Sequence, residues 1–197
     1  MGREEGFQLL ESLVVLAVLG LTAGIALPHL FRMSAGLRVD LAAGEVAGVL
    51  RQARFAAISR GYKVGVKFRG GEGRARTYTL YRDGDGDGIL NRDIDSGVDP
   101  PVAPPRELAH LGRHIRFGFP PGLAPRDPGD PRRRLKRLDV PIRFNRSDIA
   151  SFNPLGGSTP GSVYLTDSQG RLAVVRLFGR TGKVRVLTYD PRTERWR

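Results

Sequence analysis

Residues 6–28 read GFQLLESLVVLAVLGLTAGIALP, and almost every side chain from residue 7 to residue 27 is apolar. The exceptions are Gln8, Glu11, Ser12 and Thr22. At about 1.5 Å per residue, these 21 residues would form a helix roughly 30 Å long, which matches the hydrocarbon core of a bilayer. We therefore predict a transmembrane helix over residues 7–27. A carboxylate inside such a helix is costly and usually functional, so Glu11 is expected to have a partner.

The start of this apolar run carries a processing pattern. Residues 6–11, GFQLLE, followed directly by the apolar run, resemble the type IV prepilin signature. The resemblance implies that residues 1–6 are a leader, that a prepilin peptidase cuts between Gly6 and Phe7, and that Phe7 is then N-methylated. It also implies an assembly role for Glu11, the fifth residue of the mature chain, and for Pro28. Proline at this place often accompanies a helix kink, because it removes a backbone donor and clashes with the preceding turn.

This cleavage would create a partner for Glu11. The new α-amino group of Phe7 is cationic at neutral pH, since the reference pKa of such an amine is about 7.7 to 8. Within lipid, that amine on a neighbouring subunit and the Glu11 carboxylate would attract each other strongly, whereas an unpaired carboxylate is penalised. We therefore expect Glu11 to hold adjacent subunits in one register and to drive entry into a filament.

An ordinary secretory signal peptide is the alternative interpretation of this N-terminus. Such a peptide has a positive leader, an apolar core of roughly 7 to 15 residues and a small-residue cleavage site after that core. Here the leader MGREEG carries one arginine and two glutamates, and the apolar run is longer and contains Glu11. These features favour the prepilin interpretation.

Composition limits the remaining possibilities. The 197 residues have room for one anchor helix and one globular domain, and 40% of them are hydrophobic and 26% charged. There is no cysteine, which excludes a disulfide and thiol chemistry. By the pilin resemblance, this favours a minor pilin or a pseudopilin. The formal net charge of +12 attracts polyanions such as DNA, anionic lipid heads and acidic protein surfaces.

Residues 28–61 continue as an amphipathic helix. Apolar residues recur near helical spacing from Leu37 to Ala57, with charged residues between them, and Gly61 then ends the pattern. One nearly continuous helix over residues 7–60 is therefore expected.

Residues 62–197 contain short alternating runs that are typical of strands. We expect strands at residues 62–68, 77–81, 114–119, 140–144, 163–165, 172–177 and 184–188. A glycine-rich stretch at 69–76 would join the first two strands as a hairpin, and the last three strands would form a meander. Residues 100–141 hold ten of the fourteen prolines and an arginine-rich run at 132–137, which indicates a long surface excursion. The predicted fold is α+β, a long N-terminal helix packed on an antiparallel β-sheet head.

Three short stretches of this head resemble the secretion pseudopilin H group, also called GspH/FimT. They are residues 51–54 (RQAR) with Ala56 and Ala57, residues 152–158 (FNPLGGS) and residues 179–185 (GRTGKVR). The resemblance implies a structural subunit of a type II secretion pseudopilus or a type IV pilus, with one inner-membrane helix and a periplasmic head. The implied partners are other pilins and pseudopilins, the prepilin peptidase, the inner-membrane assembly platform and membrane lipid.

Enzyme activity is not expected, because no Ser/His/Asp spacing, nucleotide loop or paired acid and base stands out. A membrane-tethered hydrolase is the remote alternative, and no cofactor is required by the expected role.

An acidic loop is the sharpest local pattern after the N-terminus. Three aspartates alternate with glycines: Asp83, Asp85 and Asp87. They match the opening of an EF-hand-like calcium loop, whose hard cation needs oxygen ligands. The twelfth position is Ile94 instead of a bidentate glutamate, and Asp93 and Asp95 flank it as acidic candidates. Ca²⁺ is the expected ligand, and an acidic turn surrounded by water is the alternative.

The last 27 residues hold eight basic and two acidic side chains. Within them, residues 182–185 (GKVR) are similar to the glycine-arginine motif of DNA-receptor minor pilins in the FimT branch, with lysine in place of an arginine. Arg180, Lys183 and Arg185 would bind phosphates by counterion release, with little sequence preference and steep salt dependence. A DNA-binding minor pilin of a DNA-uptake pilus is therefore the alternative function.

Overall fold

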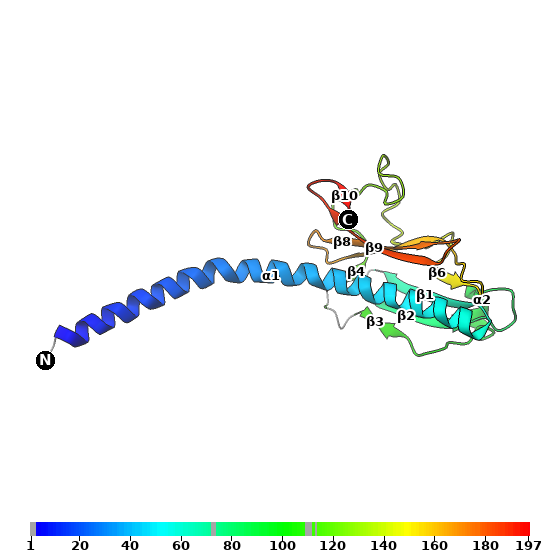
Figure 1. The fold of residues 1–197 in the computed structure, drawn as a ribbon, viewed down its shortest axis with the longest axis horizontal. Helices are drawn as coiled ribbons and strands as arrows, with labels where there is room; N and C mark the ends of the chain where they lie inside the picture. Colours follow the sequence, from blue (N-terminus) through cyan, green and yellow to red (C-terminus); the bar gives the residue numbers. More distant parts are fainter. Residues whose placement is uncertain (1–2, 72–73, 109–111, 113) are drawn as a thin grey trace. The chain divides into compact units, whose positions relative to one another are not determined.

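The computed structural model describes the backbone of residues 3–71, 74–108, 112 and 114–197. Side chains are described for residues 11–25, 37–70, 76–108, 112 and 114–197. The chain forms two compact units, Met1–Leu37 and Arg38–Arg197, and helix α1 (Arg3–Arg60) belongs to both. The second unit is called the head below. Figure 1 shows its helices and strands, coloured in the order of the sequence.

Helix α1 ends where the sequence predicts. Gly61 has φ +73°, a conformation that favours glycine, and its N–H donates to the Ala57 carbonyl at 3.1 Å. Within the head, the buried residues of α1 recur at helical spacing. They are Val39, Ala42, Ala43, Val46, Ala47, Val49, Leu50, Ala53 and Ala57. Their side chains are mostly small, so the helix backbone lies close to the strands that it covers.

The first sheet has the strand order β3-β2-β1-β6, and all its neighbouring strands are antiparallel. Its strands are β1 (Val64–Gly71), β2 (Arg74–Arg82), β3 (Arg106–Glu107) and β6 (Ile149–Phe152). Tyr78 on β2 ties this sheet to α1, because its hydroxyl donates to Glu45 Oε1 at 2.6 Å. Burial, reinforced by the Glu45 carboxylate, raises the pKa of Tyr78 to about 12 and keeps the hydroxyl protonated.

The second sheet has the order β10-β9-β8-β7-β4, and β5 also pairs with β7. Its strands are β4 (Arg116–Phe117), β5 (Ile142–Phe144), β7 (Gly161–Thr166), β8 (Leu172–Phe178), β9 (Lys183–Asp190) and β10 (Arg195–Trp196). Strands β7, β8 and β9 follow one another in sequence and in space, which confirms the predicted meander.

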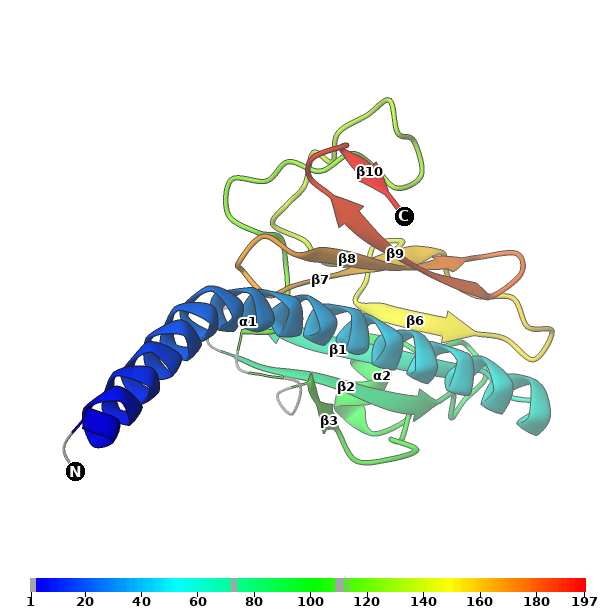
Figure 2. The same ribbon diagram turned by 60° about the vertical axis from the view of Figure 1, so that its left-hand side comes forward.

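The main core lies where α1 and the two sheets meet. Figure 2 shows the head portion of α1 running along the line where the two sheets meet. Strands β1 and β2 lie on one side of this line, and strands β8 and β9 lie on the other. Fully buried side chains from each layer meet there, such as Leu50 on α1, Phe68 on β1 and Leu165 on β7. Burying a side chain of this size contributes about 1.5–3 kcal/mol, so this shared core holds the layers together.

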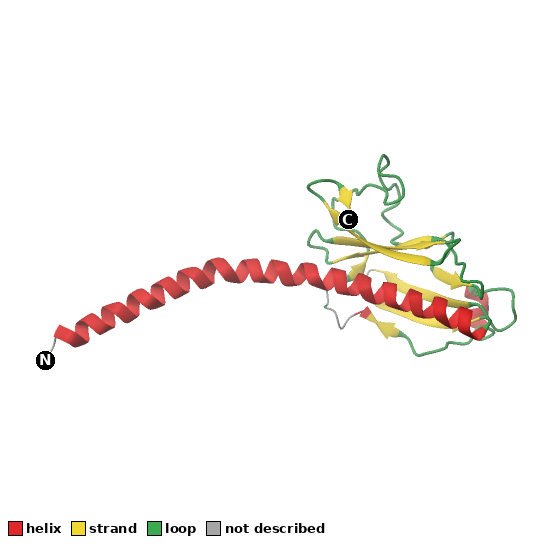
Figure 3. Cartoon of the chain, viewed as in Figure 1, coloured by secondary structure: helices red, strands yellow, loops and turns green. Residues whose placement is uncertain are grey.

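A smaller core lies on the outer face of the second sheet. Tyr164, Leu172, Val174, Leu187 and Tyr189 form it together with Phe119 and the partly buried Leu123, Leu135 and Trp196. Phe119, Leu123 and Leu135 come from the proline-rich excursion, and Trp196 comes from β10. Figure 3 shows the excursion as a green loop beside β10, which Figure 1 labels in the same view.

The excursion is fastened to the C-terminus. Glu194 receives hydrogen bonds from Arg126 Nη2 at 2.6 Å and from Arg134 Nη2 at 2.5 Å. Trp196 Nε1 donates to the Arg126 carbonyl at 2.7 Å. These contacts and the smaller core explain how a loop so rich in proline holds one conformation.

Several local expectations need correction. The stretch at 69–76 was expected to be a loop, but β1 reaches Gly71 and β2 begins at Arg74, because the two strands extend their ladder beyond the alternating pattern. The sequence pattern misses β3, β6, β10 and the short helix α2 (Asn91–Ser96). All four are only two to six residues long, so contacts with neighbouring elements decide them, not periodicity. The predicted α+β fold, a long helix packed on an antiparallel β head, is confirmed, and the strands of the head divide into two sheets.

Candidate functional site

The described residues of the first unit all lie in helix α1, and every described side chain from residue 11 to residue 25 is exposed. Leu13 is 68% exposed and Ile25 is 72% exposed, and Glu11 lies on the same helix. The side chains of Gly6, Phe7 and Pro28 lie outside the described residues. Within the described part of the chain, no helix combines the length and the apolar character that a bilayer crossing requires.

In the head, α1 also has an apolar side that the sheets leave uncovered. Leu41 is 52% exposed and Phe55 is 72% exposed. Gly44 and Gly48 lie between them along the helix, and a Cβ added at either glycine would meet nothing within 4 Å. This side, called the outer α1 face below, therefore combines large apolar groups with two places where another backbone can approach closely.

The acidic loop is built on one buried carboxylate. Asp99 is completely buried, and its two oxygens accept hydrogen bonds from the N–H groups of Gly84 at 3.0 Å and Leu90 at 3.1 Å. Gly84 is needed here because a Cβ would lie 1.9 Å from the Val98 carbonyl oxygen. Asp99 thus joins both ends of the loop and fixes its curvature. The alternating motif does not include Asp99, so the sequence interpretation missed it.

Within this loop the structure brings Asp83, Asp85 and Asp87 together. One carboxylate oxygen from each lies within 4.8 Å of the others. Two backbone N–H groups hold them in place, Gly86 donating to Asp83 Oδ1 at 2.8 Å and Asp87 donating to Asp85 Oδ1 at 3.3 Å. Three carboxylates this close repel one another, which favours a cation between them.

Two protein cations already lie beside the three aspartates. Lys63 Nζ is 3.4 Å from Asp83 Oδ2 and donates to the Gly86 carbonyl at 2.7 Å. Arg92 links Asp87 at 2.8 Å to Asp93 at 3.2 Å. Lys63 thus contacts the kinds of oxygen that a calcium ion would use. The sequence interpretation missed Lys63 because it lies twenty residues before the motif.

The remaining acidic candidates do not join the three. Asp93 is buried and faces Arg92, and Asp95 is exposed on α2. The pKa of Asp87 lies above its usual range, because lost hydration and the charges of Asp85 and Asp93 disfavour its ionised form against the pull of Arg92. A bound divalent cation would reverse this repulsion.

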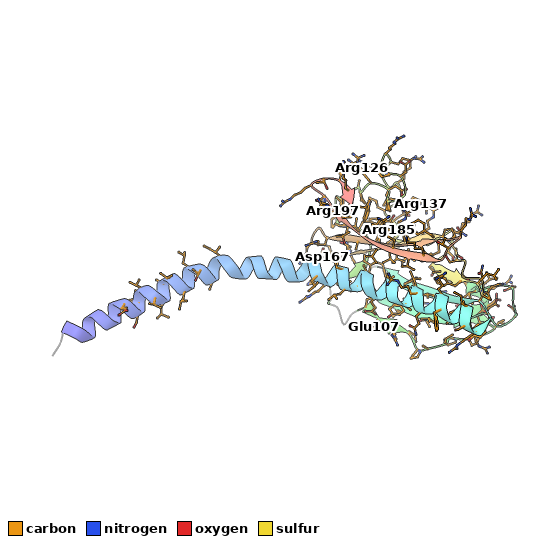
Figure 4. All side chains as sticks on the ribbon, viewed as in Figure 1. Glu107, Arg126, Arg137, Asp167, Arg185 and Arg197 are labelled. Atoms are coloured by element: carbon orange, nitrogen blue, oxygen red, sulfur yellow. The ribbon has the colours of Figure 1, made fainter. Side chains whose placement is uncertain are left out.

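The three basic residues predicted to contact DNA lie on the hairpin of β8 and β9. Arg180 is in the turn, and Lys183 and Arg185 are exposed at the start of β9. Arg185 is paired directly with Arg176 of β8. Figure 4 labels Arg185 on this strand together with Arg126 and Arg137 of the excursion. The three predicted DNA contacts therefore share one hairpin.

The three stretches that suggest the pseudopilin H group meet at one point of the head. Arg54 Nε donates to the Gly156 carbonyl at 3.1 Å. Gly182 packs against both residues, since a Cβ there would lie 2.3 Å from the Gly156 oxygen and 2.6 Å from Arg54 Nε. Gly182 also has φ +60°. Glycine is required at this position by both the conformation and the close approach.

Comparison with known proteins shows the family of the chain. The family described as type II transport protein GspH matches residues 42–181, well over half of the chain. No curated protein matches the sequence. The chain is similar to the solved structure of the minor pseudopilin EpsH from the Type 2 Secretion System of Vibrio cholerae, with 13% identity and a TM-score of 0.46. That similarity covers 77% of this chain and 97% of the other. On the strength of the family match, this chain belongs to the GspH family of type II transport proteins.

Proposed function

We propose that the chain is a minor pseudopilin, a non-enzymatic structural subunit of a type II secretion pseudopilus that assembles through α1. The observation that carries this proposal is the outer α1 face in a chain of the GspH family. We further propose cleavage after Gly6, methylation of Phe7, and anchorage in the inner membrane by residues 7–27 with the head in the periplasm.

The outer α1 face has the composition of a helix contact. Phe55 and Leu41 are each more than half exposed, which costs free energy unless another apolar surface covers them. Gly44 and Gly48 would let a neighbouring helix approach at backbone distance. Helices of other pilins and pseudopilins are the partners that fit this face.

Residues 11–25 support the same role at the other end of α1. Their exposed apolar side chains suit a surrounding of lipid or of neighbouring helices. Within that run, Glu11 would pair with the cationic Phe7 amine of an adjacent subunit and set the register of assembly. The prepilin peptidase and the inner-membrane assembly platform complete the proposed set of partners.

Site-specific photo-crosslinking in secreting cells tests this proposal. A photoreactive phenylalanine analogue at Phe55 should give covalent adducts with other pilin-like chains, because the outer α1 face contacts them in the filament. The same probe at Phe178, 37% exposed on β8, is the matched control and should give none of these adducts. Glu11→Ala should abolish the adducts formed at Phe55 if the register depends on that carboxylate.

Two results would contradict the proposal. One is a Phe55 probe that captures no pilin-like chain although the protein is expressed. The other is a mature chain whose N-terminus, by mass spectrometry, is not a methylated Phe7.

A second candidate function is a DNA receptor on a DNA-uptake pilus. It is favoured by the placement of Arg180, Lys183 and Arg185 on one exposed hairpin, where their charges can reach one phosphate backbone. This function would add to the assembly role, because the hairpin and the outer α1 face use different residues.

A further inference from the structure

A row of arginines crosses the outer face of the second sheet. Arg143 on β5 is directly opposite Ser162 on β7, Ser162 is opposite Arg176 on β8, and Arg176 is opposite Arg185 on β9. Residues paired in this way on antiparallel strands point to the same face of the sheet. The row therefore lies beside the smaller core, and it cannot be seen in the sequence, where its members are far apart.

Holding these charges together has a cost. Like charges directly opposite each other on antiparallel strands destabilise a sheet, and Arg176 and Arg185 are such a pair. The protein nevertheless fixes Arg176 firmly. Its Nη1 donates to the Pro128 carbonyl at 2.6 Å, and its guanidinium lies 5.2 Å from the centre of the Phe178 ring. A ligand would thus meet a guanidinium that is already in position.

The excursion adds further cations around Arg143 and Arg176 and borders a solvent-open cavity of about 670 Å³. Its basic lining residues are Arg133, Arg134, Lys136, Arg137, Arg143 and Arg176. Asp127 is the acidic residue of this lining, and Arg134 is paired with Glu194 outside it. Arg143 Nε donates to the Asn145 carbonyl at 3.1 Å, a bond that leaves its two terminal amino groups for other acceptors. The cavity therefore has a large excess of positive charge.

We propose that this cavity binds a small ligand carrying phosphate groups. Guanidinium groups bind phosphate oxygens through two parallel hydrogen bonds, and the cavity presents several of them. Leu135, Val140 and Pro160 supply an apolar part of the wall that suits the organic portion of a phosphate ester. The site is independent of the proposed assembly role, because none of its residues lies on α1.

The structure favours a compact ligand over an extended polyanion. Pro128 lines this cavity and also a neighbouring one that contains Arg185. At Gly129 a Cβ would lie 2.9 Å from Arg176 Nη2, so the loop passes directly over that guanidinium. This crossing interrupts the row between Arg176 and Arg185, and a nucleic-acid strand has no continuous path along it.

Calorimetric titration of the full-length chain in neutral detergent tests the site. Inorganic pyrophosphate is the soluble probe, and micelles doped with phosphatidylglycerol are the lipid probe, with phosphatidylcholine as the blank. The double variant Arg143→Gln with Arg176→Gln should weaken binding at least tenfold. Arg51→Gln with Arg82→Gln removes the same charge from two exposed arginines elsewhere in the head and should change binding less than twofold.

The two probes separate the sources of phosphate. Binding of pyrophosphate that depends on Arg143 and Arg176 supports a soluble phosphate ester, and dependence seen only with phosphatidylglycerol supports a lipid headgroup. If the first double variant does not fold, Lys136→Gln with Arg137→Gln replaces it, since both side chains are exposed.

Three results would overturn the site. One is an equal loss of affinity in the Arg143/Arg176 double variant and in the Arg51/Arg82 control, which would mean that net charge alone drives binding. Another is the absence of binding by either probe. The third is a twenty-nucleotide DNA that binds more than tenfold tighter than pyrophosphate through Arg143 and Arg176, which would make the ligand a nucleic acid.

Discussion

At the scale of single residues, the head depends on a few close approaches that tolerate no side chain. Gly182 is the clearest, because its backbone touches the Gly156 carbonyl and the Arg54 side chain. In the sequence these residues belong to three separate stretches that together resemble the pseudopilin H group. The three stretches contact one another because they join α1, the loop after β6 and the β8–β9 turn. This contact explains in physical terms why these residue types occur together.

Replacing Gly182 should therefore destabilise the head. Gly182→Ala combines a left-handed backbone with a collision against a carbonyl oxygen, and strain of this kind costs about 1–3 kcal/mol. Gly61→Ala is the matched control, since Gly61 has φ +73° but nothing within 4 Å of an added Cβ. Chemical denaturation should show a clearly larger loss of unfolding free energy for Gly182→Ala. Equal losses would mean that the close approach carries no energy of its own.

At the scale of elements, the acidic loop shows how far a local motif predicts a site. The alternating aspartates predict a cation-binding turn, and the structure gathers their carboxylates. The pattern does not reveal that Asp99 closes the loop or that Lys63 neutralises part of its charge. Both residues lie outside the motif and meet it only in the folded chain. Asp99 follows α2, and Lys63 directly precedes β1.

Calcium should raise the melting midpoint of the head, and the rise should be larger when Lys63 is replaced. With a dissociation constant of about 0.1 mM, 1 mM Ca²⁺ would contribute about 1.4 kcal/mol, or about 3–6 °C in the melting midpoint. Lys63→Met should enlarge the shift, because it removes an ammonium 3.4 Å from Asp83.

Two further variants control this thermal melt. Asp85→Asn should abolish the calcium shift, whereas Asp139→Asn, an exposed acid of the excursion, should leave it unchanged. Midpoints that do not move at millimolar calcium, in the wild type and in Lys63→Met alike, would exclude calcium binding.

At the scale of the whole molecule, the net charge does not tell where the charged side chains lie. The sequence shows a charge of +12 and the basic residues of the β8–β9 hairpin, but it does not show that Arg143, Arg176 and Arg185 line up on the outer face of the second sheet. The excursion contributes to the same side because Glu194 and Trp196 fasten it there. A protein with the same composition and a scattered charge would attract polyanions only weakly at any one place.

The hairpin charges make a prediction for DNA binding by the full-length chain. If the hairpin is a receptor surface, replacing Arg180, Lys183 and Arg185 by alanine should weaken duplex binding. It should also lower the slope of log affinity against log salt by about 2 to 3, because each lost phosphate contact contributes about 0.9.

Alanine at Arg51, Arg82 and Arg146, which are exposed elsewhere, is the control of equal charge. Fluorescence anisotropy across a salt series measures both variants. A slope that falls equally in the two would refute a dedicated surface.

Local patterns in the chain are enough to predict the α+β class, the end of α1 at Gly61, the β7–β8–β9 meander and the family. These depend on local signals: the apolar period of a helix, the alternation of a strand, and a glycine that can adopt a left-handed turn. Four features could be found only in the folded chain: the division into two sheets, the smaller core under the excursion, the closure of the acidic loop by Asp99, and the row of Arg143, Arg176 and Arg185. Each of these depends on strand register and on contacts between distant parts of the chain, which no local pattern encodes.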